Sequence, residues 1–227
     1  MADKNKKRSI ASILSRKTGV RQMALNNTAG AFGIIKNIIS GVEQDYFGTD
    51  IPHLCKIELK QLSNTDLQLR IGDDMLIFTM LPMTFMFDRD HIIWKMPYCK
   101  ENPDRACCGM INIYNFLADS IQYRREEDIG YLIARIFVNM ENHFFVEGKR
   151  QTNFWVNQFG TGIADNTSMD GVIFSAMQYV ADFDPLTPPY DDMKITNTGL
   201  LFQKIENSRL KTGKRMGFSF NSDDVTP

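Results

Sequence analysis

Glu147 and Lys149 are the residues whose types and spacing could do chemistry, because a carboxylate and an ammonium group lie two positions apart. Carboxylates are ligands that Mg²⁺ accepts, and a metal-bound water can be activated to attack a phosphate. Asp119, at the end of an upstream strand-like stretch, is the best second carboxylate. Asp119, Glu147 and Lys149 therefore form one candidate catalytic set.

The Glu147-Gly-Lys149 triplet resembles a local motif of restriction-endonuclease-like nucleases, in which the upstream acidic residue and the motif stand on adjoining strands. Here the sequence predicts a helix between the two, and a Glu-x-Lys triplet occurs by chance in most proteins of this size. A metal-dependent nuclease, or a sensor that binds a small ligand at this strand, is therefore kept as the alternative function. His143, beside two phenylalanines, fits a packing role better than that of a base.

The segment that leads to Glu147 is predicted to be a helix followed by a strand. The helix is inferred from apolar residues that recur at three- and four-residue spacing: Ile129, Leu132, Ile133, Ile136, Phe137 and Met140. Acids at 126–128 fall in its first turn, where the helix dipole stabilises a carboxylate by about 0.3–1 kcal/mol. The aromatic run 143–150 predicts a strand that ends at Gly148.

Cys99, Cys107 and Cys108, with His91, are the candidate metal ligands, because structural zinc is held by four tetrahedral donors from cysteine and histidine. Such sites usually present pairs of cysteines a few residues apart, whereas adjacent cysteines on an extended backbone point to opposite faces. The spacing therefore favours buried reduced thiols. The chain has only four cysteines, too few for a dense disulfide framework, which favours a reducing compartment.

The elements that would position these residues form an α+β fold. Alternation of apolar and polar residues predicts an antiparallel meander sheet of four to six strands, drawn from residues 55–60, 67–71, 75–87 with an interruption at Pro82, 91–96, 107–116 and 143–148. Helical spacing predicts about three helices that pack on this sheet: residues 28–46 with Thr28 as N-cap, about 126–140, and 168–182 with Ser168 as N-cap.

Charge divides the chain into three parts. Residues 1–21 hold seven Lys and Arg against one Asp, and residues 204–215 hold five against one Glu, while residues 22–203 hold 14 bases against 23 acids. We therefore predict a basic N-terminal arm over 1–21, a globular α+β domain over 22–183, and a Pro-rich linker with a C-terminal arm over 184–227. A basic arm can bind an acidic protein surface or a phosphate backbone.

These arms predict a non-enzymatic assembly or adaptor protein that self-associates or joins a multi-protein complex, as structural components of virus particles and secretion apparatus do. The residues expected to make its contacts lie on the arms: Lys6, Lys7, Arg8, Arg16, Lys17, Arg21, Phe202, Lys211, Lys214, Arg215, Phe218 and Phe220. No cofactor is expected, and the basic arms also fit nucleic acid. No apolar run reaches the roughly 18 residues of a membrane span, so the cytoplasm, or a virion for a viral protein, is the expected location.

Overall fold

The computed structural model describes residues 2–47, 57–124, 128–148 and 159–182, together with the single positions 190, 198, 199 and 202. Within the first helix, side chains are described for residues 7–42. The described residues contain one antiparallel sheet of six strands and four α-helices. The predicted α+β fold with a meander sheet is therefore confirmed.

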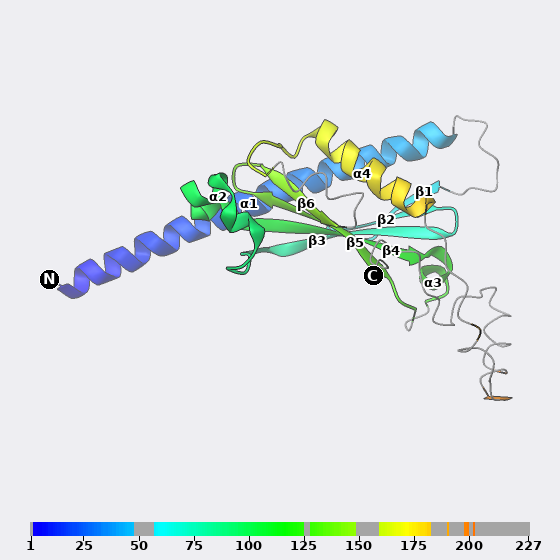
Figure 1. The fold of residues 1–227 in the computed structure, drawn as a ribbon, viewed down its shortest axis with the longest axis horizontal. Coiled ribbons are helices and arrows are strands. Elements are labelled where there is room, and N and C mark those ends of the chain that lie inside the picture. Colours follow the sequence, from blue (N-terminus) through cyan, green and yellow to red (C-terminus); the bar gives the residue numbers. More distant parts are fainter. Residues whose placement is uncertain are drawn as a thin grey trace.

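The strands pair in chain order, and each is antiparallel to the next (Figure 1). The elements are α1 (Ala2–Phe47), β1 (Ile57–Gln61), β2 (Asp66–Ile71), β3 (Asp74–Phe85), the 3-10 helix η1 (Ile92–Lys95), α2 (Pro97–Glu101), the 3-10 helix η2 (Pro103–Ala106), β4 (Cys108–Leu117), α3 (Ala118–Gln122), β5 (Tyr131–Asn139), β6 (Phe144–Gly148) and α4 (Asn166–Ala181). Helix α1 is much longer than the sheet and extends past one end of it.

Local sequence explains the first three strands. Strands β1 and β2 carry the predicted alternation, so that Leu67 and Leu69 are buried. Gly72, with a φ of +59°, forms the tight turn into β3, a conformation that glycine adopts without steric cost. Pro82 lies where the register between β3 and β4 shifts, because proline has no N–H to give to the ladder. Residues 75–87 thus contain one strand with an irregularity at the predicted interruption.

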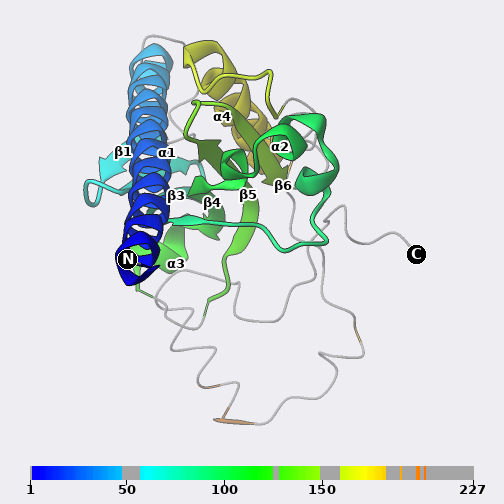
Figure 2. The same ribbon diagram turned by 90° about the vertical axis from the view of Figure 1, so that its left-hand side faces the viewer.

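Helices α1 and α4 bury their apolar faces on one face of the sheet. From α1, the buried residues include Phe32, Ile35 and Ile39, and α4 contributes Val172 and Ile173, all in one cluster with sheet residues. A second, smaller cluster lies on the other face, because Phe137 and Phe145 oppose each other between β5 and β6 and alternate with residues of the first cluster. The η1, α2 and η2 segments cover this second cluster, and α2 lies across the strands from α1 in Figure 2.

Residues 91–96 were predicted as a strand, and this is wrong, because they form η1 and its two caps. The His91 side chain accepts a hydrogen bond from the Ile93 N–H, which satisfies a donor at the start of the turn. Pro97 then opens α2, where a residue without an N–H is tolerated. Ile93 is buried in the second cluster, and its neighbour Trp94 is partly buried against the same cluster.

The helix predicted near residues 126–140 is also wrong, because residues 131–139 form β5. The stretch is nearly continuous in apolar residues and rich in β-branched and aromatic side chains, so helical and strand spacing both match it. Strand β5 lies between β4 and β6, and both of its faces are covered except at Arg135 and the first two residues. The helix-dipole explanation of the acids fails with it: Asp128 accepts a hydrogen bond from the Ser120 hydroxyl at 2.7 Å, while residues 126 and 127 lie outside the described residues.

Two predicted helix starts are wrong. Thr28 does not begin a helix, because α1 runs unbroken from Ala2 and the Thr28 hydroxyl donates to the Ala24 carbonyl one turn earlier. Ser168 is the third residue of α4, whose cap is Asp165; the Asp165 carboxylate accepts the Ser168 N–H at 2.8 Å. The predicted division of the chain into arm, domain and linker stays a prediction.

Gly109 sets the approach of α1 to the sheet. A Cβ atom at this position would lie 2.2 Å from the Thr28 hydroxyl oxygen, which no real contact reaches. Thr28 is fully buried. The helix therefore lies against the start of β4 at a distance that only glycine permits.

We predict that Gly109→Ala lowers the free energy of unfolding by about 1–3 kcal/mol, as overpacking of a core does. The control is Gly30→Ala, at an exposed position of α1 with no atom within 4 Å of the added methyl group. The control should raise stability by up to about 1 kcal/mol, because alanine favours the helix. Urea unfolding of both variants checks the prediction, and equal effects at the two positions would contradict it.

Candidate functional site

Glu147, the acid of the predicted catalytic triplet, is held by two neighbours. It lies on β6 directly opposite Arg135 of β5, whose guanidinium donates to Glu147 Oε2. The other oxygen, Oε1, lies 2.6 Å from His91 Nε2. Because His91 Nδ1 accepts the Ile93 N–H, Nε2 carries the ring proton and donates it to Glu147. Oε1 thus ties η1 to the sheet, and Oε2 joins β6 to β5.

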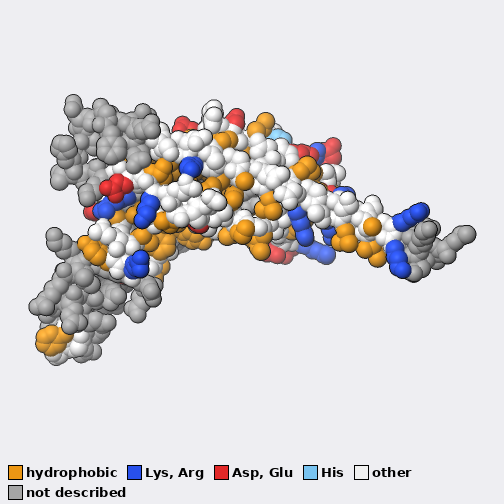
Figure 3. Space-filling view, turned by 180° about the vertical axis from the view of Figure 1, so that it is seen from behind, with side chains coloured by type: hydrophobic (Ala, Val, Ile, Leu, Met, Phe, Trp, Pro, Cys, Tyr) orange, Lys and Arg blue, Asp and Glu red, His pale blue; other side chains and the backbone are white. Residues whose placement is uncertain are grey.

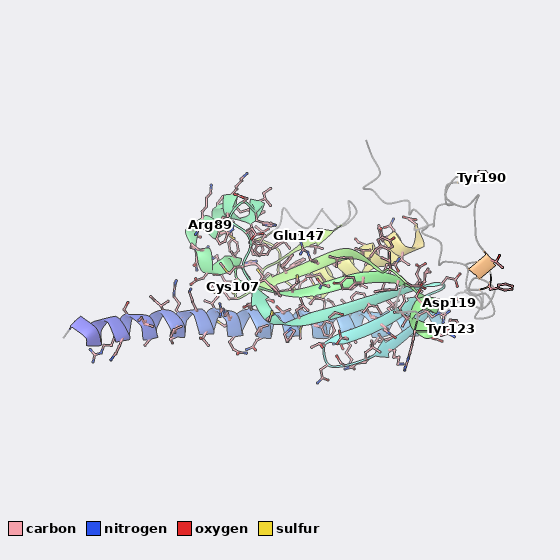
Figure 4. All side chains as sticks on the ribbon, turned by 90° about the horizontal axis from the view of Figure 1, so that it is seen from below. Arg89, Cys107, Asp119, Tyr123, Glu147 and Tyr190 are labelled. Carbon is pink, nitrogen blue, oxygen red and sulfur yellow. The ribbon has the colours of Figure 1, made fainter. Side chains whose placement is uncertain are left out.

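Asp119 does not lie beside Glu147. In the sheet register, Asn112 of β4 is level with Arg135 and Glu147, and Leu117 is five residues further along. At about 3.3 Å per residue, this separation is roughly 16 Å, and Asp119 follows Leu117 in α3. Figure 4 shows Asp119 and Glu147 well apart in the molecule. Lys149 lies outside the described residues, so the nuclease hypothesis stays a prediction.

The three cysteines of the predicted metal site are buried free thiols. Burial raises the pKa of Cys99 to about 11 and that of Cys108 well above its usual range, so both thiols are protonated at neutral pH. Among the residues that the structure describes, no three side chains of His, Cys, Asp or Glu converge as metal ligands would. Cys99 and Cys108 pack in the second cluster with Phe137 and Phe145.

Residues 7–19 of α1 form a segment that leaves the body of the protein, called here the projecting segment. Every side chain in it is exposed, and Val20 is the first buried residue of the helix. The segment includes three large apolar residues, Ile10, Ile13 and Leu14, which are 58%, 47% and 59% exposed. Figure 3 shows hydrophobic side chains along this part of the helix beside Lys and Arg side chains.

The apolar residues of the projecting segment belong to the face with which α1 packs on the sheet. Eighteen residues make about five full turns of an α-helix, so residues 18 apart share one side. Ile10, Ile13 and Leu14 each precede a buried residue by this interval, in the pairs Ile10 with Thr28, Ile13 with Ala31 and Leu14 with Phe32. The apolar stripe that covers the sheet therefore continues beyond its end, where no described residue covers it.

Polar contacts fix the place where α1 leaves the body. Asn27 donates to the Asn139 and Met140 carbonyls, both at 3.0 Å, and so holds the helix to the turn after β5. Nearer the N-terminus, Arg16 donates to Asp104 of η2 at 2.9 Å. The Arg16 side chain is exposed, so this ion pair contributes about 0–1 kcal/mol and serves mainly to orient the segment.

A partly exposed polar network supports η2 at that point. Arg105 donates to Glu141 at 3.0 Å and to the Tyr98 carbonyl at 3.1 Å, and its guanidinium lies 4.5 Å from the centre of the Tyr98 ring. The Tyr98 hydroxyl donates to Glu141 at 2.7 Å and accepts from Asn139 at 2.8 Å. Burial raises the pKa of Tyr98 well above its usual range, which keeps this hydroxyl protonated as a donor.

Charge on α1 is of one sign over most of its length. Residues 4–42 contain eight Lys and Arg and no acid. Two of the bases, Lys17 and Arg21, are exposed and fall on the same side as the apolar stripe, since they precede the buried Ile35 and Ile39 by 18 residues. A partner that covers Ile10, Ile13 and Leu14 therefore meets positive charge beside the apolar surface.

The contact residues were predicted to lie on the arms, and those predicted in the N-terminal arm are all basic. The predicted bases of the N-terminal arm lie on α1, on the projecting segment or close to it: Lys6, Lys7, Arg8, Arg16, Lys17 and Arg21. In the C-terminal arm, Phe202 is 62% exposed. The other predicted contact residues lie outside the described residues: Lys211, Lys214, Arg215, Phe218 and Phe220. Ile10, Ile13 and Leu14 were missed. Their i, i+3, i+4 spacing in a stretch without proline is the signal that could have found them.

We predict a pH dependence at Glu141. Burial alone would raise its pKa, but hydrogen bonds from Tyr98 and Arg105 and the charge of Arg105 outweigh burial and hold the pKa below its ordinary value of 4.5. The ionised form therefore stabilises the fold above about pH 4.5, and this contribution is lost as the pH falls through the lowered pKa. Glu141→Gln should lose stability at neutral pH and show a smaller further loss in acid than the wild type.

Urea midpoints measured at neutral pH and at about pH 3 check this prediction. The control is Glu101→Gln, which removes the other carboxylate bound to Arg105 at a position 76% exposed, where salt bridges contribute about 0–1 kcal/mol. If acid lowers the stability of Glu141→Gln as much as that of the wild type, Glu141 is not the group responsible for the pH dependence.

The chain was compared with models of protein families, with curated proteins and with solved structures, and no match was found. Among the helices that the structure describes, none is long and apolar enough to cross a membrane. The function is therefore inferred from the residues themselves, and the uncovered stripe of the projecting segment is the feature with the clearest physical consequence.

Proposed function

We propose that this protein is a non-enzymatic assembly or adaptor protein, which self-associates or joins a larger complex through the projecting segment of α1. One observation carries the proposal: the stripe that packs on the sheet continues through Leu14, Ile13 and Ile10 with these side chains about half exposed or more. Contiguous exposed apolar surface next to charged residues is typical of protein-protein contact sites.

The free energy available from such a contact is considerable. Complete burial of one isoleucine or leucine side chain is worth about 1.5–3 kcal/mol. The three residues of the projecting segment retain roughly half of their exposure, so a partner that covered them would gain on the order of 3 kcal/mol from apolar burial alone. Hydrogen bonds and charge pairs at the rim would add to this value.

The residues on the opposite side of the projecting segment also indicate that its helix needs a packing partner for stability. This side carries small residues of modest or low helix propensity, among them Ser12, Ser15 and Gly19. A helical segment of about 13 residues is marginal in water without tertiary packing. Continuity with the packed part of α1 supplies the nucleus, and a partner on the apolar side would stabilise the helix further.

A protein surface suits the segment better than nucleic acid does. A phosphate backbone would pair with Lys17 and Arg21 but would leave Ile10, Ile13 and Leu14 in water. An apolar surface with acidic residues at its edge would satisfy both kinds of side chain. The bonds of Glu147 to His91 and Arg135 give its carboxylate a structural role, which supports a non-enzymatic function.

We predict that the wild-type protein forms species heavier than its 26.1 kDa chain, and that the double variant Ile10→Ser, Leu14→Ser does not. The two side chains are exposed in the single chain, so their removal should change its stability by only about 0.5 kcal/mol each. Light scattering during size-exclusion chromatography over a range of concentrations measures the mass, and the absorbance spectrum of the same peak reports any nucleic acid that co-purifies.

The control is Met23→Ser, an exposed apolar position nine residues, or about two and a half turns, after Leu14 and therefore on the opposite side of α1. This variant should associate as the wild type does. A wild type of 26.1 kDa at every concentration, an unchanged mass in the double variant, or nucleic acid that accounts for the extra mass would each overturn the proposal.

A further inference from the structure

Helix α4 presents an exposed apolar residue among acids on its outer side. Phe174 is 66% exposed, although the opposite side of the same helix is buried on the sheet. Asp170 lies one turn before Phe174 and is exposed, and Asp182 caps the helix about two turns after it. The outer side of α4 is therefore an apolar anchor with acids near both of its ends.

The charges of α4 and α1 are opposite along their lengths. Residues 166–181 contain one acid and no Lys or Arg, and both caps of α4, Asp165 and Asp182, are acids. Residues 4–42 of α1 contain bases and no acid. Hydrogen bonds from the Ser168 N–H and side chain lower the pKa of Asp165, so this cap stays charged under ordinary conditions.

The two surfaces also match in length. Asp170 and Asp182 are about 18 Å apart along α4, at 1.5 Å per residue, with Phe174 between them. On α1, Ile10 and Arg21 span about 17 Å, with Leu14 and Lys17 between them. Each helix thus offers an apolar side chain and charges of one sign over about three turns.

The projecting segment cannot reach α4 of its own chain, because it extends away from the end of the sheet opposite to the C-terminal part of α4 (Figure 1). Two projecting segments are unsuited to pair with each other. Such a pair would bring together two helices that carry bases and no acid over residues 4–42, and like charges side by side destabilise a contact.

We infer that the projecting segment docks on the outer side of α4 in a second copy of this chain. The inference rests on the proposed self-association and adds its partner surface and its symmetry. Ile10, Ile13 and Leu14 of one copy cover Phe174 of the next, while Lys17 and Arg21 face Asp170. The two surfaces differ, so the contact is head-to-tail: in a pair of copies, one keeps a free α4 face and the other keeps a free projecting segment.

Head-to-tail contacts between identical copies produce a ring where the rotation closes and a filament where it does not. A contact between two single helices is small beside the roughly 1,200–2,000 Å² of a standard interface. Association should therefore be weak for one pair, should rise with concentration, and should weaken as salt screens the charges.

Mixing two different variants tests the head-to-tail arrangement. Phe174→Ser removes the anchor of α4, and Ile10→Ser, Leu14→Ser removes the apolar residues of the segment. Each variant alone should stay at 26.1 kDa. An equimolar mixture should form a complex of twice that mass that grows no further, because the Phe174→Ser copy supplies an intact segment and the other copy an intact α4.

The control for Phe174→Ser is Ile129→Ser, which removes a side chain that is 75% exposed just before β5 and should associate as the wild type does. If Phe174→Ser associates as the wild type does, or if the mixture stays at the single-chain mass while the wild type assembles, the α4 contact is overturned and the proposed function stands. If the wild type does not associate, both are overturned.

Charge reversal supplies a second measurement. Lys17→Glu and Asp170→Lys should each weaken association about two- to five-fold at low salt, as rim charges do. The two changes in one chain should restore affinity, because every contact then carries the reversed pair. Additive weakening in the double variant would overturn the pairing of these two helix faces.

Discussion

The close packing of α1 on the sheet is the constraint on which the rest of the structure depends. Gly109 admits the Thr28 side chain where no Cβ atom would fit, and the apolar stripe of the helix meets the sheet from this point onward. A straight helix keeps one face on one side, so packing at Thr28 and Phe32 also decides the direction in which Ile10 and Leu14 point. The core and the proposed interface are two parts of one stripe.

Polar contacts complete this arrangement at the point where the helix leaves the body. Asn27 holds α1 to the turn after β5, and the network of Tyr98, Arg105 and Glu141 keeps η2 in place for the pair between Asp104 and Arg16. Surface ion pairs contribute little stability, but they can hold an exposed helix in one direction. The basic α1 and the acidic α4 then present complementary surfaces at different places on one molecule.

Much of the sheet could be predicted from the sequence, because alternation in residues 57–60 and 67–71 and the turn at Gly72 are local signals that the strand pairing bears out. Residues 131–139 could not be assigned in this way. Their apolar run matches the spacing of a helix and that of a strand. Which of the two forms depends on whether neighbouring elements cover one face of the segment or both faces. The strand predicted at residues 91–96 was wrong for a related reason. These residues form a turn that begins at His91, and His91 is bonded to Glu147, 56 positions away in the sequence.

The sequence by itself determined the α+β class, the meander, the separation of charge along the chain and the basic character of the first 21 residues, since composition and local spacing are sufficient for these. Only the tertiary structure decided where the sheet ends beneath α1, and hence that Ile10, Ile13 and Leu14 lie uncovered while Ala31 and Phe32 are buried. It also joined Glu147 to His91 and Arg135 and kept Asp119 away. Burial and pairing are properties of neighbours in space, which spacing along the chain does not specify.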